Sequence, residues 1–182
     1  MCRYLKIVEN AIKSFNEKEQ YLIENTLSER CICSRFALYI TNELIKQKYY
    51  GYVADVEYNR NAAKNGEQTD ENKKIIYEND NKEIASVPTE RPHLITVDLI
   101  VHKRGNSTNN LICIEMKKST NKKGFQSDRV RLKYLTSHKD FRYQLGVMIV
   151  INMPDKKKNE KGFLEIESIV EKGIIKSPEI CE

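Results

Sequence analysis

The chain has 182 residues, with 31 Lys or Arg against 26 Asp or Glu, so its formal net charge is +5 at pH 7. This length can bury a core without disulfides or metal staples, and we expect a single domain over residues 1–182. The mean hydropathy of −0.62 and the lack of any apolar run near ~20 residues exclude a membrane-spanning class and a membrane partner.

The cysteines and glycines exclude further classes. Five cysteines are scattered along the chain, and they show no zinc-ligand spacing with the histidines. An odd number of cysteines without a recognisable signal peptide indicates reduced thiols, so we expect a cytoplasmic protein. No glycine pattern of a P-loop or Rossmann enzyme is present.

The first third of the chain predicts helices followed by a strand. Apolar residues recur at helical spacing from Tyr4 to Phe15, which predicts a helical segment over residues 1–27. Ser28 suits the N-cap of a second helix that extends to about Lys48. Residues 53–58 alternate in polarity and predict a strand.

A polar insertion follows at about residues 60–92. It is rich in Asn, Lys and Glu, and a loop of this length is unusual in a compact domain. Two interpretations stay open: a flap that closes over substrate, or a disordered insertion, which we favour. Residues 75–77 could form a brief strand within it.

The next two apolar runs, residues 94–102 and 111–118, flank a polar turn and predict an antiparallel hairpin. Asp98 and Glu115 are equidistant from the middle of this turn. A symmetric register therefore places them opposite one another, with Cβ atoms ~5 Å apart. Because side chains alternate along a strand, Lys117 shares a face with Glu115.

Acidic side chains inside apolar strands are costly unless something compensates them. Two neighbouring carboxylates favour a proton or a divalent cation between them, and oxygen ligands suit magnesium or manganese. The alternative is a surface Glu–Lys pair at a strand end, with Asp98 satisfied by an arginine. The spacing alone leaves both interpretations open.

The remainder predicts a helix over residues 125–138 and strands over residues 143–151 and 163–169. The natural assembly is an α/β domain with a central mixed β-sheet flanked by helices. Residues 117–142 carry nine Lys or Arg against two Asp. Such a segment suits a phosphate backbone, although it could be a solvated helix face.

Asp98, followed by Glu115-Met-Lys117 at the end of the next strand, resembles the PD-(D/E)XK signature of the restriction-endonuclease-like nuclease superfamily. Val97 stands where that signature has a proline, a position that varies within the superfamily. The resemblance covers about two thirds of the chain, from residue 28 to about 151. Further segments resemble those of small bacterial members in the same order: residues 28–40, 55–60, 99–105, 110–119 and 128–136.

The resemblance implies a restriction-endonuclease-like core and a nuclease that hydrolyses phosphodiester bonds with a metal-activated water. Asp98, Glu115 and the backbone carbonyl of Met116 would bind Mg²⁺ or Mn²⁺, and Lys117 would orient the water and stabilise the phosphate. The helix residue Glu29 would assist. The alternative for Glu29 is an ordinary acidic residue at a helix N-terminus.

The resemblance and the basic segment together predict nucleic acid as the partner, with DNA favoured over RNA, and a homodimer is left open. The expected nucleic-acid contacts are Lys118, Lys122, Lys123, Arg129, Arg131 and Lys133. Arg35 could bind a phosphate or pair with a carboxylate. Two other functions compete: a catalytically silent module that binds nucleic acid or a protein partner, and a fold with a purely structural cation.

Overall fold

Six strands form one mixed sheet in the computed structural model, which describes residues 2–58, 74–75, 93–94, 96–121, 124–155 and 160–178. The strand order is β1-β4-β5-β6-β7-β8, with β5 and β6 parallel and the other neighbours antiparallel. The strands span Val53–Tyr58 (β1), Val97–Lys103 (β4), Asn106–Lys118 (β5), Leu145–Asn152 (β6), Phe163–Glu171 (β7) and Ile174–Lys176 (β8). The predicted α/β class with a mixed sheet and flanking helices is confirmed.

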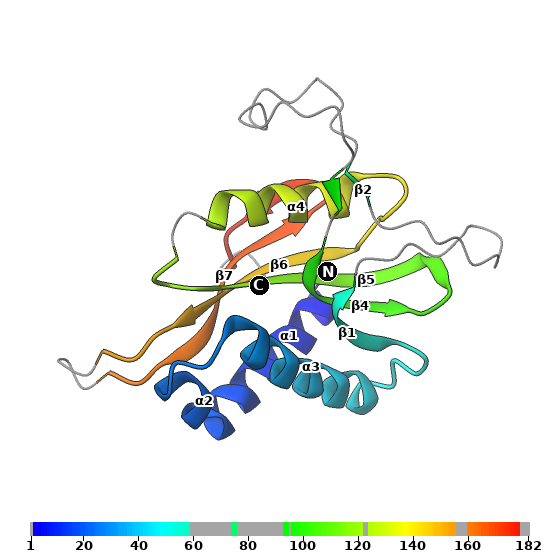
Figure 1. The fold of residues 1–182 in the computed structure, drawn as a ribbon. Helices are drawn as coiled ribbons and strands as arrows, with labels where there is room; N and C mark the ends of the chain where they lie inside the picture. Colours follow the sequence, from blue (N-terminus) through cyan, green and yellow to red (C-terminus); the bar gives the residue numbers. More distant parts are fainter. Residues whose placement is uncertain are drawn as a thin grey trace.

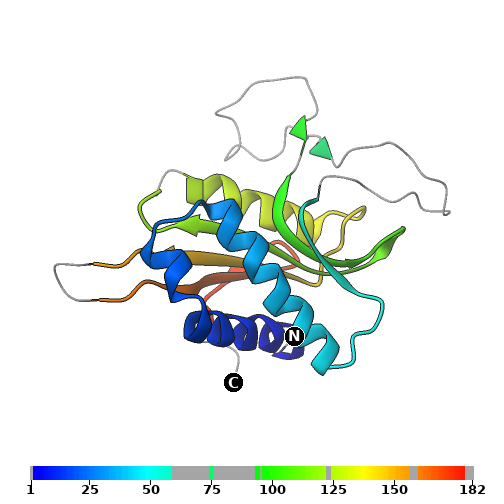
Figure 2. The same ribbon diagram turned by 60° about the horizontal axis from the view of Figure 1, so that its bottom comes forward.

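Helices cover both faces of this sheet (Figure 1). On one face α1 and α3 pack together, and α4 lies on the other, as the turned view also shows (Figure 2). The helices span Cys2–Lys18 (α1), Gln20–Glu24 (α2), Glu29–Lys46 (α3) and Phe125–Ser137 (α4). Because both faces of the sheet are covered, β5 is buried from Leu111 to Met116, as expected for a central strand.

Two separate cores result. The larger core lies under α1 and α3 and takes the side chains of Leu99, Ile112 and Ile114. The smaller core lies under α4 and takes those of Ile100 and Cys113. Alternate residues of each strand therefore face different helices, which decides which helix a given polar residue can reach.

The N-terminal segment differs from one continuous helix. The first helix ends at Lys18 and the short α2 follows. Ser28 then caps α3, because its Oγ accepts a hydrogen bond from the Cys31 N–H at 3.2 Å. The predicted N-cap is confirmed, and α3 ends two residues before the predicted limit.

The hairpin has the predicted register but a different turn. Leu99 pairs with Ile114 and Val101 with Ile112, which continues to Asp98 opposite Glu115. The reversal lies at Arg104 and Gly105, where Gly105 has a φ of +72°. Two register shifts beside His102 compensate for the displaced turn, so the prediction of a turn over residues 103–110 was wrong.

After β5 the chain forms α4 and then the parallel strand β6. Helix α4 packs closely on the sheet at Gly146. A Cβ at Gly146 would lie 3.2 Å from the Thr136 Cγ2 atom. The predicted helix at 125–138 and the two later strands are confirmed within a few residues, whereas the edge strand β8 was not predicted.

Most of the polar insertion lies outside the described residues. Both interpretations of it, a flap and a disordered insertion, concern those residues. Its described part is β2 (Lys74–Ile75), which pairs with β3 (His93–Leu94). In the described part of the chain, no helix combines the length and the apolar character that crossing a membrane requires.

Candidate functional site

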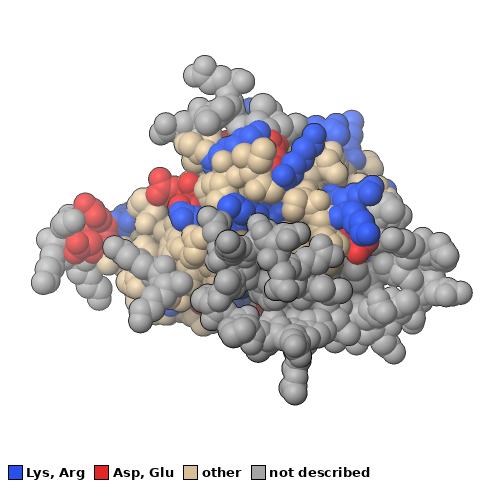
Figure 3. Space-filling view, turned by 90° about the horizontal axis from the view of Figure 1, so that it is seen from above, with Lys and Arg blue, Asp and Glu red and all other residues tan. Residues whose placement is uncertain are grey.

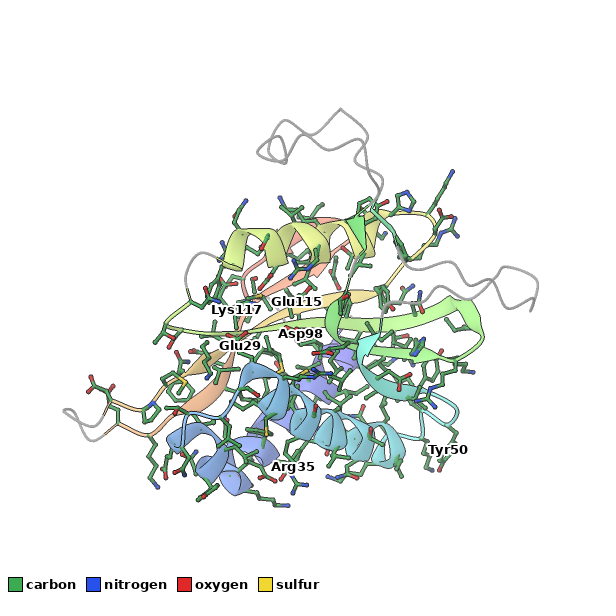
Figure 4. All side chains as sticks on the ribbon, viewed as in Figure 1. Glu29, Arg35, Tyr50, Asp98, Glu115 and Lys117 are labelled. Carbon is green, nitrogen blue, oxygen red and sulfur yellow. The ribbon has the colours of Figure 1, made fainter. Side chains whose placement is uncertain are left out.

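Four of the predicted site residues meet between α3 and α4 (Figure 4). Asp98 lies at the start of β4, Glu115 and Lys117 lie near the end of β5, and Glu29 lies in the first turn of α3. The Oε1 atom of Glu29 accepts the backbone N–H of Lys118 at 2.9 Å, so this helix residue points at the end of β5.

Glu115 is the most deeply buried member, with 1% of its surface exposed. Its Oε1 atom accepts a hydrogen bond from Arg131 Nε at 2.7 Å. Its Oε2 atom has no hydrogen-bond partner among the described residues. Burial, together with the nearby Asp98 and Asp128, raises the pKa of Glu115 to about 8 against the opposing effect of Arg131.

Asp98 is held by the backbone of the neighbouring strand. Its Oδ2 atom accepts the Met116 N–H at 2.7 Å. Burial raises the pKa of Asp98, while this hydrogen bond and a side-chain hydrogen bond with the Glu115 carboxyl oppose the rise. The carbonyl of Asp98 accepts the Cys33 thiol at 3.2 Å, and burial together with the carboxylates raises the pKa of that thiol. Cys33 is therefore a neutral packing group rather than a nucleophile.

Lys117 lies between two carboxylates. Its Nζ atom is 3.2 Å from Asp128 Oδ2 and 3.6 Å from Glu29 Oε2. Burial by itself lowers the pKa of Lys117, but Asp128, Glu29 and Asp98 outweigh this effect and the pKa is raised. The side chain is thus an ammonium group in a fixed position.

Two residues of α4, Asp128 and Arg131, connect these groups, a role that the sequence patterns do not indicate. Arg131 binds both Glu115 and Asp128, and the Asp128 side chain is only 2% exposed. We had predicted Arg131 as a phosphate contact and counted Asp128 only as a charge. Their spacing of three residues was the available signal, because it places both on one face of a helix. Nothing in the sequence indicated that this face turns toward Glu115.

The residues that we predicted to contact nucleic acid have different hydrogen-bond and ion-pair partners in the structure. Arg129 pairs with Glu167, and Arg131 with the site carboxylates. The Lys118 ammonium donates to the Thr26 carbonyl at 3.3 Å. Within the described part of the chain Lys133 makes no ion pair, while Lys122 and Lys123 lie outside the described residues. On the surface that carries α4, Lys and Arg side chains form separate groups (Figure 3).

Two other polar residues lie apart from the carboxylate cluster. Arg35 pairs with Glu19 at 2.7 Å, so of its two interpretations the structure shows the carboxylate pair. His102 is buried, and its Nε2 atom is 2.9 Å from Asp55 Oδ2.

The donor set can be compared with the needs of a divalent cation. Among the described residues, no three His, Cys, Asp or Glu side chains gather into a metal-binding group. The cluster offers the carboxylates of Asp98 and Glu115, and the carbonyl of Met116 remains a predicted third donor. The buried, unpartnered Oε2 of Glu115 is an oxygen that a cation would satisfy. So few protein ligands fit magnesium or manganese, which keep several waters in such sites.

No protein-family model, curated protein or solved structure matches this chain. The likeness to PD-(D/E)XK nucleases therefore rests on the residues quoted above.

Proposed function

We propose that the protein is a Mg²⁺- or Mn²⁺-dependent nuclease of the PD-(D/E)XK type, which hydrolyses phosphodiester bonds in nucleic acid, with DNA favoured over RNA. One observation carries this proposal. The buried carboxylate of Glu115, one oxygen of which has no partner among the described residues, lies beside the half-buried carboxylate of Asp98, and the ammonium of Lys117 is fixed between Asp128 and Glu29. An acidic pair that has no catalytic or binding role would be a costly feature of a core strand.

The residues divide the chemistry between them. A magnesium ion held by Asp98 and Glu115 would supply Lewis-acid charge for an in-line displacement. Because Lys117 is protonated, it donates hydrogen bonds and carries a positive charge. It therefore orients the attacking water and stabilises the charge that develops on the phosphate. Arg131 keeps the other oxygen of Glu115 bound, which fixes the direction of the carboxylate.

A catalytically silent binding module is the second candidate, and the ion pairs of the cluster favour it. Arg131 binds Glu115 and Asp128, while Lys117 binds Asp128 and Glu29. These contacts compensate most of the buried charge without any metal. A fold of this kind could contact nucleic acid or protein through its surface alone.

Cleavage assays separate the two candidates. Supercoiled plasmid and short single- and double-stranded DNA and RNA are incubated with Mg²⁺, Mn²⁺ or EDTA, and metal binding is measured by calorimetry. We expect metal-dependent cleavage that disappears in Glu115→Ala and in Lys117→Ala. The matched control is Glu165→Ala, which removes an exposed carboxylate on β7 that bonds only Asn152 among the described residues.

The outcomes point in different directions. Cleavage that persists in folded Glu115→Ala protein would remove this cluster from the mechanism. A folded wild-type protein that neither cleaves nor binds Mg²⁺ or Mn²⁺ would favour the binding module. Equal thermal stabilisation by Ca²⁺ and Mg²⁺ without any turnover would indicate a structural cation.

A further inference from the structure

A cavity of about 430 Å³ lies beside Asp98, where the first turns of α3 face β1 and β4. This volume falls within the range of about 300–1,000 Å³ that is typical of small-molecule sites. It can take one nucleobase and is far too small for a duplex. The walls include Ser28, Arg30, Cys33, Val56, Glu57 and Asp98.

Glu57, in the wall of this cavity, has an unusual backbone conformation. Its φ is +52°, in the left-handed region that side chains other than Gly, Asn and Asp rarely adopt. Strand β1 pairs with β4 through Val56 and Tyr58 on either side of Glu57. A glycine would relieve the strain, so the strand itself has no need of a glutamate here. Such strained residues gather at functional sites.

Arg30 and Glu57 connect α3 to β1 at the cavity. Their Nη2 and Oε2 atoms are 2.9 Å apart, and their side chains are 75% and 38% exposed. An ion pair this exposed contributes little to folding, so its partners can exchange it for a ligand. Together they present an acceptor and a set of donors, which is the combination that the edge of a nucleobase requires.

The charge of the walls indicates which part of a nucleotide would enter. Three carboxylates (Glu29, Glu57 and Asp98) stand against the two cations Arg30 and Lys118. This excess of negative charge disfavours a phosphate inside the cavity. It favours a neutral base, above all one whose exocyclic amino group donates to a carboxylate.

We propose that this cavity binds one unpaired nucleobase next to the phosphate that the Asp98–Glu115 pair addresses, with Glu57 and Arg30 as the base-contacting residues. The inference rests on the proposed nuclease function and narrows its substrate. A paired base enters such a cavity only after it leaves the stack. The substrate is therefore a single strand or an unpaired strand end.

The test begins without metal, so that it does not depend on cleavage. In EDTA, 2′-deoxycytidine 5′-monophosphate is titrated into the full chain and followed by amide NMR, beside 2′-deoxyuridine 5′-monophosphate and inorganic phosphate. We expect the cytidine nucleotide to shift the amides of the first turn of α3 and of Glu57. The uridine nucleotide, which lacks the amino group, should bind at least about fivefold more weakly. Phosphate alone should leave these amides unchanged.

Three variants make the assignment specific. Glu57→Gly removes the carboxylate and relieves the backbone, so it should bind the cytidine nucleotide about tenfold more weakly with an equal or higher unfolding temperature. Arg30→Ala should weaken binding as well. Arg35→Ala is the matched control, because it removes an arginine of the same helix whose carboxylate partner is Glu19.

The possible outcomes test the base site and the nuclease function separately. Equal shifts with phosphate alone, or unchanged affinity in Glu57→Gly, would overturn the base site. With Mg²⁺, cleavage of a closed hairpin duplex as fast as a single strand would also overturn it and leave the nuclease standing. Nucleotide binding in EDTA by a protein that cleaves no substrate would refute the nuclease and retain the base site.

Discussion

The Nε atom of Arg131 donates to Oε1 of Glu115 over 2.7 Å, so a guanidinium on α4 holds the deepest carboxylate of the cluster. Arg131 also binds Asp128, whose other oxygen faces Lys117. Four charged side chains of β5 and α4 therefore form one continuous network. The helix that follows the hairpin in sequence is what orders the groups on the hairpin.

Arg131→Ala should destabilise the fold strongly. The substitution leaves Glu115 buried without its partner, and removing one member of a buried pair costs about 3–5 kcal/mol. Urea unfolding measures the loss. The matched control is Arg129→Ala on the same helix, whose partner Glu167 is partly exposed, and it should cost less than about 1 kcal/mol. Equal losses in the two variants would contradict the network.

Gly124→Ala should displace Lys117 while the fold stays intact. A Cβ at Gly124 would lie 3.1 Å from the Lys117 Cε atom, and Gly124 has an ordinary φ of −77°. If the chain is a nuclease, misplacing this ammonium should lower the cleavage rate by about tenfold to a hundredfold. The unfolding midpoint should not fall. Gln126→Ala, on the exposed side of the same helix turn, should retain full activity.

Gly162→Ala should destabilise the contact between the start of β7 and α2. A Cβ there would lie 2.3 Å from Ile23 Cγ2 and 2.8 Å from the Asn152 carbonyl oxygen. Overpacking of this kind costs about 1–3 kcal/mol, which thermal unfolding can measure. The same substitution in an Ile23→Ala background should cost less. An identical cost in both backgrounds would show that Ile23 is not the obstacle.

Lys133 and Arg129 should differ in nucleic-acid binding. Arg129 is paired with Glu167, whereas Lys133 makes no ion pair within the described part of the chain. Lys133→Ala should lower the affinity and reduce the slope of log K against log salt concentration by about 1. Fluorescence anisotropy with a labelled strand measures both quantities. A larger effect from Arg129→Ala would show that Glu167 releases its partner on binding.

Asp55 should make stability depend on pH. Hydrogen bonds from Arg104 lower the pKa of Asp55 below its ordinary 3.8, burial opposes this, and His102 adds to the lowering. Because the folded pKa lies below the unfolded one, the stabilisation is fully present above about pH 5. It is lost as the pH falls through the folded pKa.

The measurement is the free energy of unfolding as a function of pH for wild type and Asp55→Asn. The difference between the two proteins should be constant above about pH 5 and shrink steadily below 3.8. A difference that does not change with pH would mean that the charge of Asp55 contributes nothing.

Local patterns in the sequence were sufficient for the elements and for the central pairing. Ser28 could be identified as an N-cap because its side chain bonds an N–H only three residues away. The hairpin register followed from the alternation of two neighbouring runs, since a slip by one residue would turn each buried side chain outward. That register brings Asp98, Glu115 and Lys117 to one end of the sheet.

Tertiary packing alone decided what surrounds these three residues. Asp128 and Arg131 turn inward because α4 lies on the Gly146 surface of the sheet, and no local pattern distinguishes this helix face from a solvated one. The left-handed backbone of Glu57 likewise follows no local pattern, and its ion pair with Arg30 joins segments that are far apart in sequence. Hydrogen bonds to neighbours and side-chain alternation are short-range and can be read along the chain. The partner of a charge depends on which elements come together, and that is determined only when the whole core is packed.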